Sequence, residues 1–374
     1  MFSIKEFIKK EFVLFAAFVL AVASCFFVHP DFTYISYIDF RTLGILLSLM
    51  IIMAGLGNLL VFRRIGEFLV FKMNSTRSLA LIFIGLCFFS SMFITNDVAL
   101  ITFVPFTVVT LTVSNRKDLF IPVIVLETIA ANLGSMLTPL GNPQNLYLYS
   151  LSEMPFFDFI LLMLPYSICS AALLFFMTFL YVKNAPVKLN EKTKFKTTRS
   201  DTLKIFMYIV LFAISILVIV RIVPFQAGLV IVLASVFLFD KKVLKCPDYS
   251  LLFTFIFLFI FIGNIKRIPL LSEILNELVK LNEVVVSAVL SQFISNVPAA
   301  ILCSGFTSDI PALIVGTNLG GLGTLIASMA SLISFKQYIS TDNSDVKKYM
   351  SVFTFLNILF LMVLLILYFL SLHF

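Results

Sequence analysis

Long apolar stretches follow one another along most of the chain, and short groups of charged or polar residues separate them. An apolar stretch of about 18 or more residues is long enough to cross a membrane as a helix. Alternating strands typical of a membrane barrel do not occur in the pattern. We therefore predict an all-α polytopic membrane protein. The pattern indicates nine complete crossings, with approximate bounds 11–29, 42–62, 119–150, 156–182, 205–222, 224–240, 250–264, 309–335 and 348–372.

Two more apolar segments, residues 78–113 and 283–306, carry a short polar group at their centre. Arg77 precedes the first segment and Arg116 follows it. Because basic residues beside spans stay on the cytoplasmic side, both ends of this segment are expected in the cytoplasm. A straight crossing would separate the two ends, whereas a hairpin that enters and leaves on one side keeps them together. We predict a re-entrant hairpin at each segment, bent where its polar residues lie.

The spans at 119–150 and 309–335 contain residues that interrupt a membrane helix. The triplet Asn-Leu-Gly occurs at 132–134 and again at 318–320. Residues 132–145 also hold two Pro, two Gly and three Asn, which a regular lipid-facing helix does not accommodate. We predict two interrupted transmembrane helices.

These features recur in the same order in two parts of the chain. Residues 1–182 contain the first hairpin and interrupted helix, residues 205–374 contain the second pair, and the lysine-rich residues 183–204 form a cytoplasmic linker. Counting crossings places the N-terminus inside, the C-terminus outside and the second hairpin opposite to the first. The two parts are thus predicted to be inverted structural repeats, an architecture of secondary transporters. Residues 65–77 and 265–282 are amphipathic and predict helices at the membrane interface.

Composition agrees with this class and excludes others. The chain of 374 residues is 60% hydrophobic and 13% charged. Its net charge of +7 comes from basic residues in loops between spans, which indicates topology and not nucleic-acid binding. The five Cys and two His are scattered, so neither a disulfide framework nor a metal centre is expected, and the interior offers too few catalytic groups for an enzyme. A first span is favoured over a signal peptide, because no small-residue cleavage pattern follows it.

Polar side chains at the bends and breaks are the candidates for a binding site. Asn is unfavourable inside a helix, and in lipid its amide needs a partner. Helix ends at a bend leave carbonyl groups that bind cations and N–H groups that bind anions, so Asn96 and Asn296 are possible Na⁺ ligands. The alternative, that these groups only cap helices, leaves the paired Asn-Leu-Gly breaks unexplained. The predicted substrate- and ion-binding residues are Thr95, Asn96, Asp97, Asn132, Gly134, Thr138, Gly141, Asn142, Asn145, Ser295, Asn296, Asn318, Gly320 and Thr324.

Two acidic residues lie deep in predicted membrane segments, where a charge is costly and indicates a function. Asp97 is the acid at the first bend, and Val297 takes its place at the second. It is expected to bind a cation or carry a proton, or else to stabilise the helix that begins there by its charge. Glu127, in the middle of the first interrupted helix, is either a second proton carrier or an internal partner of a polar neighbour.

At these motifs the chain resembles the ion transporter superfamily, in the branch of arsenite permeases, citrate transporters and divalent-anion symporters. The resemblance rests on Thr95-Asn96-Asp97, on the segment from 132 to 145, and on the Ser-Asn pair at 295–296. It implies a scaffold domain that often forms a homodimer interface and a transport domain that moves like an elevator. Dicarboxylate carriers of this family have Ser-Asn-Thr at both bends. The Asn-Asp pair at 96–97 is closer to the arsenite-permease-like members.

The expected function is therefore secondary active transport of a small inorganic or organic anion across the cytoplasmic membrane, coupled to Na⁺ or H⁺ by alternating access. No phosphate-binding Gly-Lys-Ser/Thr loop is present in the chain, so no ATPase activity of its own is expected. No cofactor is predicted beyond the coupling ion. The alternative is a Na⁺/H⁺ antiporter in which Asp97 exchanges the two cations.

Overall fold

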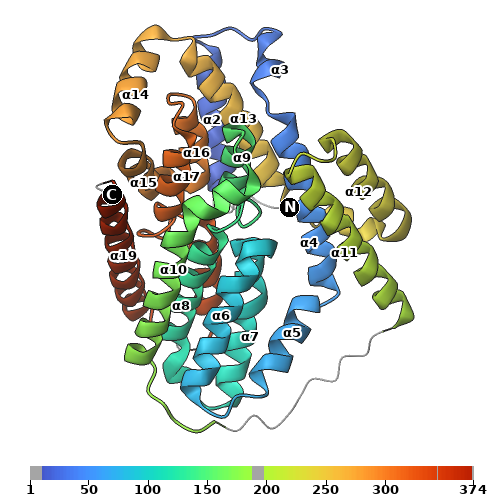
Figure 1. The fold of residues 1–374 in the computed structure, drawn as a ribbon, viewed down its shortest axis with the longest axis vertical. Coiled ribbons are helices and arrows are strands. Elements are labelled where there is room, and N and C mark those ends of the chain that lie inside the picture. Colours follow the sequence, from blue (N-terminus) through green and yellow to red (C-terminus); the bar gives the residue numbers. More distant parts are fainter. Residues whose placement is uncertain (1–10, 188–197, 343, 373–374) are drawn as a thin grey trace.

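The computed structural model describes residues 11–187, 198–342 and 344–372, which fold into helices joined by loops (Figure 1). Eight of the described helices are long and apolar enough to cross a membrane, which confirms the prediction of an all-α polytopic membrane protein. In chain order the helices are α2 (Phe12–Cys25), α3 (Thr33–Tyr37), α4 (Phe40–Asn58), α5 (Val61–Val70), α6 (Thr76–Ile94), α7 (Asn96–Val113), η1 (Lys117–Leu119), α8 (Phe120–Ser135), α9 (Pro143–Ser152), α10 (Phe156–Tyr181), α11 (Arg199–Ile219), α12 (Phe225–Phe239), η2 (Lys241–Lys245), α13 (Tyr249–Lys266), α14 (Pro269–Leu281), α15 (Glu283–Ile294), α16 (Asn296–Ser304), α17 (Ile310–Leu319), α18 (Met329–Ile339) and α19 (Val346–Ser371).

Helix breaks occur in the four segments where the sequence places polar residues, Gly and Pro. α6 and α7 meet at Thr95, and α15 and α16 meet at Ser295. A loop separates α8 from α9, which begins at Pro143 with the side chain of Asn142 accepting a hydrogen bond from the Asn145 N–H group. A second loop separates α17 from α18. Each break leaves backbone N–H and C=O groups at helix ends without partners in their own helix.

Some boundaries differ from those predicted. α4 ends four residues before the expected position, because Leu60 adopts a left-handed backbone (φ 56°) and α5 starts at once. α11 begins at Arg199, inside the predicted linker 183–204, because Thr198 and Asp201 form a capping box. Part of that linker, residues 188–197, lies outside the described residues. The first amphipathic helix, 61–70, begins four residues and ends seven residues before the predicted segment 65–77, and the second, 269–281, lies within the predicted 265–282.

The broken helices lie at the centre of the molecule. α8 is buried along its whole length except at Pro122, and it packs against α6, α7, α10, α18 and α19. α17 packs against α9, α15 and α16 in a similar way. The peripheral helices α10, α11 and α19 keep many apolar side chains exposed. Such exposure is unfavourable in water and is satisfied by lipid.

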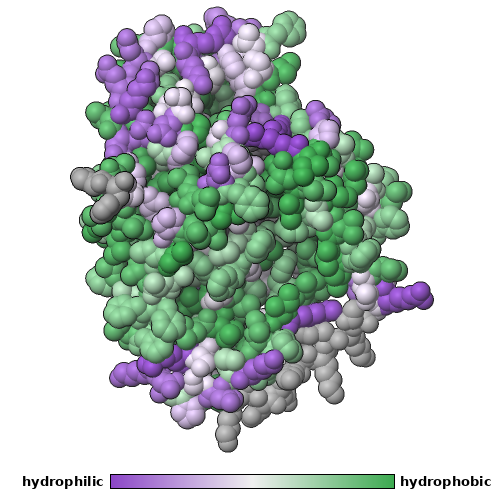
Figure 2. Space-filling view, in the orientation of Figure 1, coloured by the Kyte–Doolittle hydropathy of each residue, from purple (hydrophilic) through white to green (hydrophobic). Residues whose placement is uncertain are grey.

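The surface agrees with this arrangement. Figure 2 shows hydrophobic residues over the middle of the molecule and hydrophilic residues gathered at its two ends. A bilayer places its hydrocarbon core against such a belt and its headgroups against the polar ends. The surface therefore fits a membrane whose normal runs along the long axis of the molecule.

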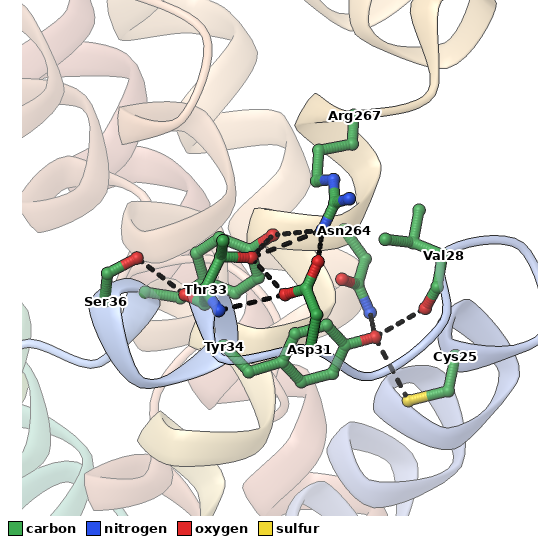
Figure 3. A network of polar contacts seen from close by, with 9 residues as sticks. Cys25, Val28, Asp31, Thr33, Tyr34, Ser36, Asn264 and Arg267 are labelled. Atoms are coloured by element: carbon green, nitrogen blue, oxygen red, sulfur yellow. Dashed lines mark hydrogen bonds and ion pairs between the residues drawn. The ribbon is translucent and has the colours of Figure 1, made fainter.

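A polar network ties the loop after α2 to the end of α13 (Figure 3). Arg267 donates a hydrogen bond from Nη1 to Oδ2 of Asp31 at 2.8 Å, and this pair is also a salt bridge. Asn264 donates from Nδ2 to the Ser24 hydroxyl at 2.9 Å and to the Tyr34 hydroxyl at 2.7 Å. These contacts hold α2, α3 and α13 together, and α13 supplies one wall of the cavity described next.

Candidate functional site

Two helix junctions have nearly the same unusual backbone. Thr95 has φ 69° and ψ 150°, and Ser295 has φ 73° and ψ 154°. This region is sparsely populated by any residue other than Gly and costs on the order of 1–3 kcal/mol. Neither side chain makes a capping hydrogen bond to the helix that follows, so the alternative of simple caps is wrong for these two residues. Strain of this kind is retained where the surrounding structure fixes it, commonly at functional sites.

The same backbone contact follows each junction. The N–H group of Asn96 donates to the Gly141 carbonyl at 3.1 Å, and the N–H group of Asn296 donates to the Ala327 carbonyl at 3.0 Å. Both acceptors lie in the loop that interrupts a neighbouring helix. Each strained junction is therefore fixed by the break beside it.

Side-chain contacts between each junction and the neighbouring break are also similar in the two halves of the chain. Thr138 donates its hydroxyl to the Met92 carbonyl, and Thr324 donates to the Gln292 carbonyl at 3.0 Å. At Gly134 an added Cβ would lie 2.0 Å from the Phe88 carbonyl oxygen, so only glycine permits this approach of α8 to α6. Gly134 and the two Thr residues thus pack the breaks against the helix pairs α6–α7 and α15–α16.

A buried group of asparagines lies where the two breaks meet, and we call Asn96, Asn132, Asn142, Asn145 and Asn318 the Asn cluster. Asn142 donates from Nδ2 to Oδ1 of Asn318 at 3.1 Å, and Asn318 donates from Nδ2 to Oδ1 of Asn145 at 2.5 Å. Asn96 donates from Nδ2 to Oδ1 of Asn132 at 3.0 Å. All five side chains belong to the predicted site, and the fold brings them together from segments far apart in sequence.

Two serines that sequence reasoning missed complete the cluster. Ser328 donates its hydroxyl to Oδ1 of Asn132 at 3.0 Å, and Asn132 donates from Nδ2 to the Ser331 hydroxyl at 3.3 Å. Ser328 and Ser331 follow Asn318 by the same ten and thirteen residues by which Asn142 and Asn145 follow Asn132. That spacing was the signal that could have found them. Each half of the chain thus supplies partners to the Asn of the other half.

A cavity of about 610 Å³ adjoins the first junction, and we call it the tip cavity. Thr95, Asp97 and Asn142 lie on its wall at the junction. Sequence reasoning missed two charged lining residues, Arg63 at the start of α5 and Asp248 at the start of α13. Tertiary packing brings these helix ends to the hairpin, and no local motif marks them.

The charges around the tip cavity are mostly negative or already paired. Asp97 lies in the first turn of α7, and its buried Oδ1 atom has no hydrogen-bond partner among the described residues. Asp248 accepts a hydrogen bond from the Leu251 N–H group at 3.2 Å. Arg63 bonds Glu67 at 3.3 Å. The cavity wall therefore offers carboxylate, hydroxyl and amide oxygens, but its arginine is already engaged.

Several predicted residues lie away from this cavity. Ser295, Asn296, Gly320 and Thr324 belong to the second junction, which does not line it. Glu127 is fully buried between α8 and the first hairpin. Its Oε1 atom accepts hydrogen bonds from the Thr107 hydroxyl at 2.6 Å and from the Cys87 thiol at 3.8 Å. Its Oε2 atom has no partner among the described residues.

Broken helices that meet at a buried polar cluster beside a cavity, within a lipid-embedded bundle, define a membrane transporter. The chain matches the model of the citrate transporter family over residues 2–310, and it belongs to that family. It is 35% identical over 297 residues to the uncharacterized transporter MJ0456 of Methanocaldococcus jannaschii, covering 79% of this chain and 80% of that one. It is 31% identical over 308 residues to the inner membrane protein YbiR of Escherichia coli, covering 80% of each chain. A shorter match, 31% over 129 residues, covers 34% of this chain and 26% of the silicon efflux transporter LSI3 of Oryza sativa.

Proposed function

We propose that the protein is a secondary active transporter that moves a small anion across the cytoplasmic membrane, coupled to Na⁺ or H⁺. The observation that carries this proposal is the position of the tip cavity. It reaches a strained helix junction where Thr95, Asp97 and Asn142 lie on its wall, next to the buried Asn cluster. Helix ends in such a junction bind small ions through backbone groups and side-chain oxygens.

The transport mechanism that we propose is alternating access by two inverted repeats with re-entrant hairpins. The paired contacts support it, because Thr95 and Ser295 share a backbone conformation and each following Asn bonds the neighbouring break. In this topology the N-terminus is inside and the C-terminus outside, as the basic loops indicate. The name of YbiR supports an inner-membrane location. The family resemblance further leads us to propose a homodimer.

Charge at the tip cavity favours a second candidate, a Na⁺/H⁺ antiporter that carries no anion. Asp97 and Asp248 both line the cavity, whereas Arg63 is engaged by Glu67. Carboxylates attract cations and repel anions unless a cation is already bound. In the symport model the coupling cation occupies these oxygens first and makes the site ready for the anion. In the antiport model the cations alone use it.

Transport by the purified protein in proteoliposomes distinguishes the two candidates. A thermal-shift screen of oxyanions and carboxylates selects the substrates, because a ligand that binds the native state raises its melting temperature. Symport predicts uptake of a selected anion that needs an inward Na⁺ or H⁺ gradient and is lost in Asn96→Ala. Antiport predicts Na⁺-dependent movement of protons, read with a luminal pH dye, with no anion uptake. Vesicles that behave like protein-free liposomes in both assays would contradict both candidates.

A further inference from the structure

The tip cavity joins two elements that are distant in sequence, and each brings a carboxylate. Asp97 stands in the first turn of α7, at the strained junction, and Asp248 stands at the N-terminus of α13. Both line the same cavity of about 610 Å³. This pairing was not visible in the sequence, where 150 residues separate them.

One oxygen of the Asp97 carboxylate has no role in the described part of the fold. Its Oδ1 atom is buried and has no hydrogen-bond partner among the described residues. A buried polar oxygen without a partner destabilises the fold, and more so when it is charged. Asp97 lines the tip cavity, where a bound cation can approach its carboxylate. The neighbouring cavity oxygens of Thr95 and Asn142 are of the kind that hard cations prefer.

Asp248 caps α13, but capping does not require an acid at this position. Its Oδ1 accepts from the Leu251 N–H group, and Asn would serve a cap equally well. Three other Asp residues cap helices in the same way, at 39, 309 and 345. Of the four, Asp248 is the one that lines the tip cavity.

Among the described residues that line the cavity, no basic side chain is free to neutralise the two carboxylates. Arg63 is the basic lining residue, and its Nε atom lies 3.3 Å from Oε1 of Glu67. Glu67 is buried on α5, so the arginine balances a charge of its own helix. Two acids that share a cavity repel each other unless a cation or proton lies between them.

We propose that Asp97 and Asp248 together form a monovalent-cation site in the tip cavity, with Asp248 as a ligand-binding residue. The inference deepens the proposed function, because this cation is the coupling ion of the transporter. A cation bound there joins α7 to α13 and removes the repulsion between their carboxylates. Its presence thereby favours closure of the cavity, and its release favours opening.

Direct cation binding tests the site without a transport assay. The chain has no Trp, so Phe62→Trp on the cavity wall introduces a single fluorescent reporter. The reporter protein in nanodiscs is titrated at fixed pH with NaCl or LiCl, and choline chloride keeps the ionic strength constant. We expect a saturable fluorescence change that is weakened at least tenfold by Asp248→Asn. Asp345→Asn removes an equivalent capping charge outside the cavity and should bind like the parent.

Thermal unfolding of the chain without the Trp provides a second measurement. NaCl should raise the melting temperature relative to choline chloride in the parent and in Asp345→Asn, and by much less in Asp248→Asn. Equal affinities of the parent and Asp248→Asn would overturn the proposal, as would a response to MgCl₂ alone. If Asp248 is needed for cation binding in a protein that transports neither anions nor protons, the site stands and the proposed function fails.

Discussion

Asn142, the cap residue before α9, donates a hydrogen bond from Nδ2 to Oδ1 of Asn318 in α17 at 3.1 Å, although the two lie 176 positions apart in the sequence. Ser328 makes the equivalent contact in the opposite direction, to Asn132. The two breaks therefore hold each other through exchanged side chains. This contact predicts that a change in one break affects the other half of the molecule.

Asn142→Ala should lower the free energy of unfolding by about 1–3 kcal/mol, because it leaves the buried Asn318 oxygen without this donor. Asn142→Ser copies the residue found at position 328 and should recover part of the loss. Melting temperatures in detergent measure the effect. Asn74→Ala, at an exposed loop position, is the control. A melting temperature of Asn142→Ala equal to that of the control would show that the exchanged contact does not stabilise the fold.

The re-entrant hairpin that we propose for α6 and α7 predicts that both ends of the pair face the cytoplasm. In a Cys246→Ser background, Asn74→Cys and Lys117→Cys should react with an impermeant maleimide from the same side of the membrane. Both positions are exposed. His29→Cys, expected outside, should react from the other side. Labelling of positions 74 and 117 from opposite sides would mean a simple crossing and would remove the inverted topology.

Much of this architecture could be predicted from local sequence. Asn-Leu-Gly triplets and clustered Pro mark the breaks, because such residues cannot continue a membrane helix. Arg63 and Asp248 could not be found in this way, since their importance depends on which helix ends the fold places at the junction. The start of α11 was missed for a local reason, the capping box of Thr198 and Asp201.

Glu127 provides a test of proton coupling that is independent of the tip cavity. Leu313 stands five residues before Asn318, as Glu127 stands five before Asn132, and Leu313 is also fully buried. Packing at this position thus does not require an acid. Glu127→Gln keeps an acceptor for the Thr107 hydroxyl but cannot carry a proton. We expect folded protein whose uptake no longer responds to a pH gradient.

The control for Glu127 is Thr107→Val, which removes the donor and keeps the carboxyl group. It should retain the response to the pH gradient. The measurement is initial uptake in proteoliposomes with and without an imposed pH difference, at equal Na⁺ on both sides. An unaltered response in Glu127→Gln would leave this residue with a structural role.

The network around Asp31 makes stability depend on pH. Hydrogen bonds from the Thr33 side chain and from Arg267 hold the pKa of the Asp31 carboxyl below its usual value. Because the folded-state pKa is lowered, the stabilisation is present above the unfolded-state pKa and is lost as pH falls through the folded-state pKa. Asp31→Asn should melt slightly lower than the parent at neutral pH, and the difference should vanish in acid. Arg267→Gln should lower the melting temperature further, because Arg267 also bonds Thr33 and Tyr37, and the double variant should lose less than the sum of the two single changes. Additive losses would contradict a shared interaction.

Asp97 is the acid at one junction, and Val297 occupies the matching position at the other, so the repeat that we propose does not require an acid there. We therefore expect Asp97 to have a role that the second junction does not share, namely coupling transport to the cation. Asp97→Asn keeps the shape of the side chain and one amide oxygen but removes the charge. Concentrative uptake driven by an ion gradient should fall to the level of protein-free liposomes, while exchange of substrate across the membrane continues weakly. If the residue only stabilised the start of α7, Asn would serve nearly as well, because the two rank together at helix N-termini. The deciding measurement is gradient-driven uptake by Asp97→Asn from mildly acidic to mildly alkaline pH. Rates and a pH profile equal to those of the parent would exclude a coupling role for Asp97.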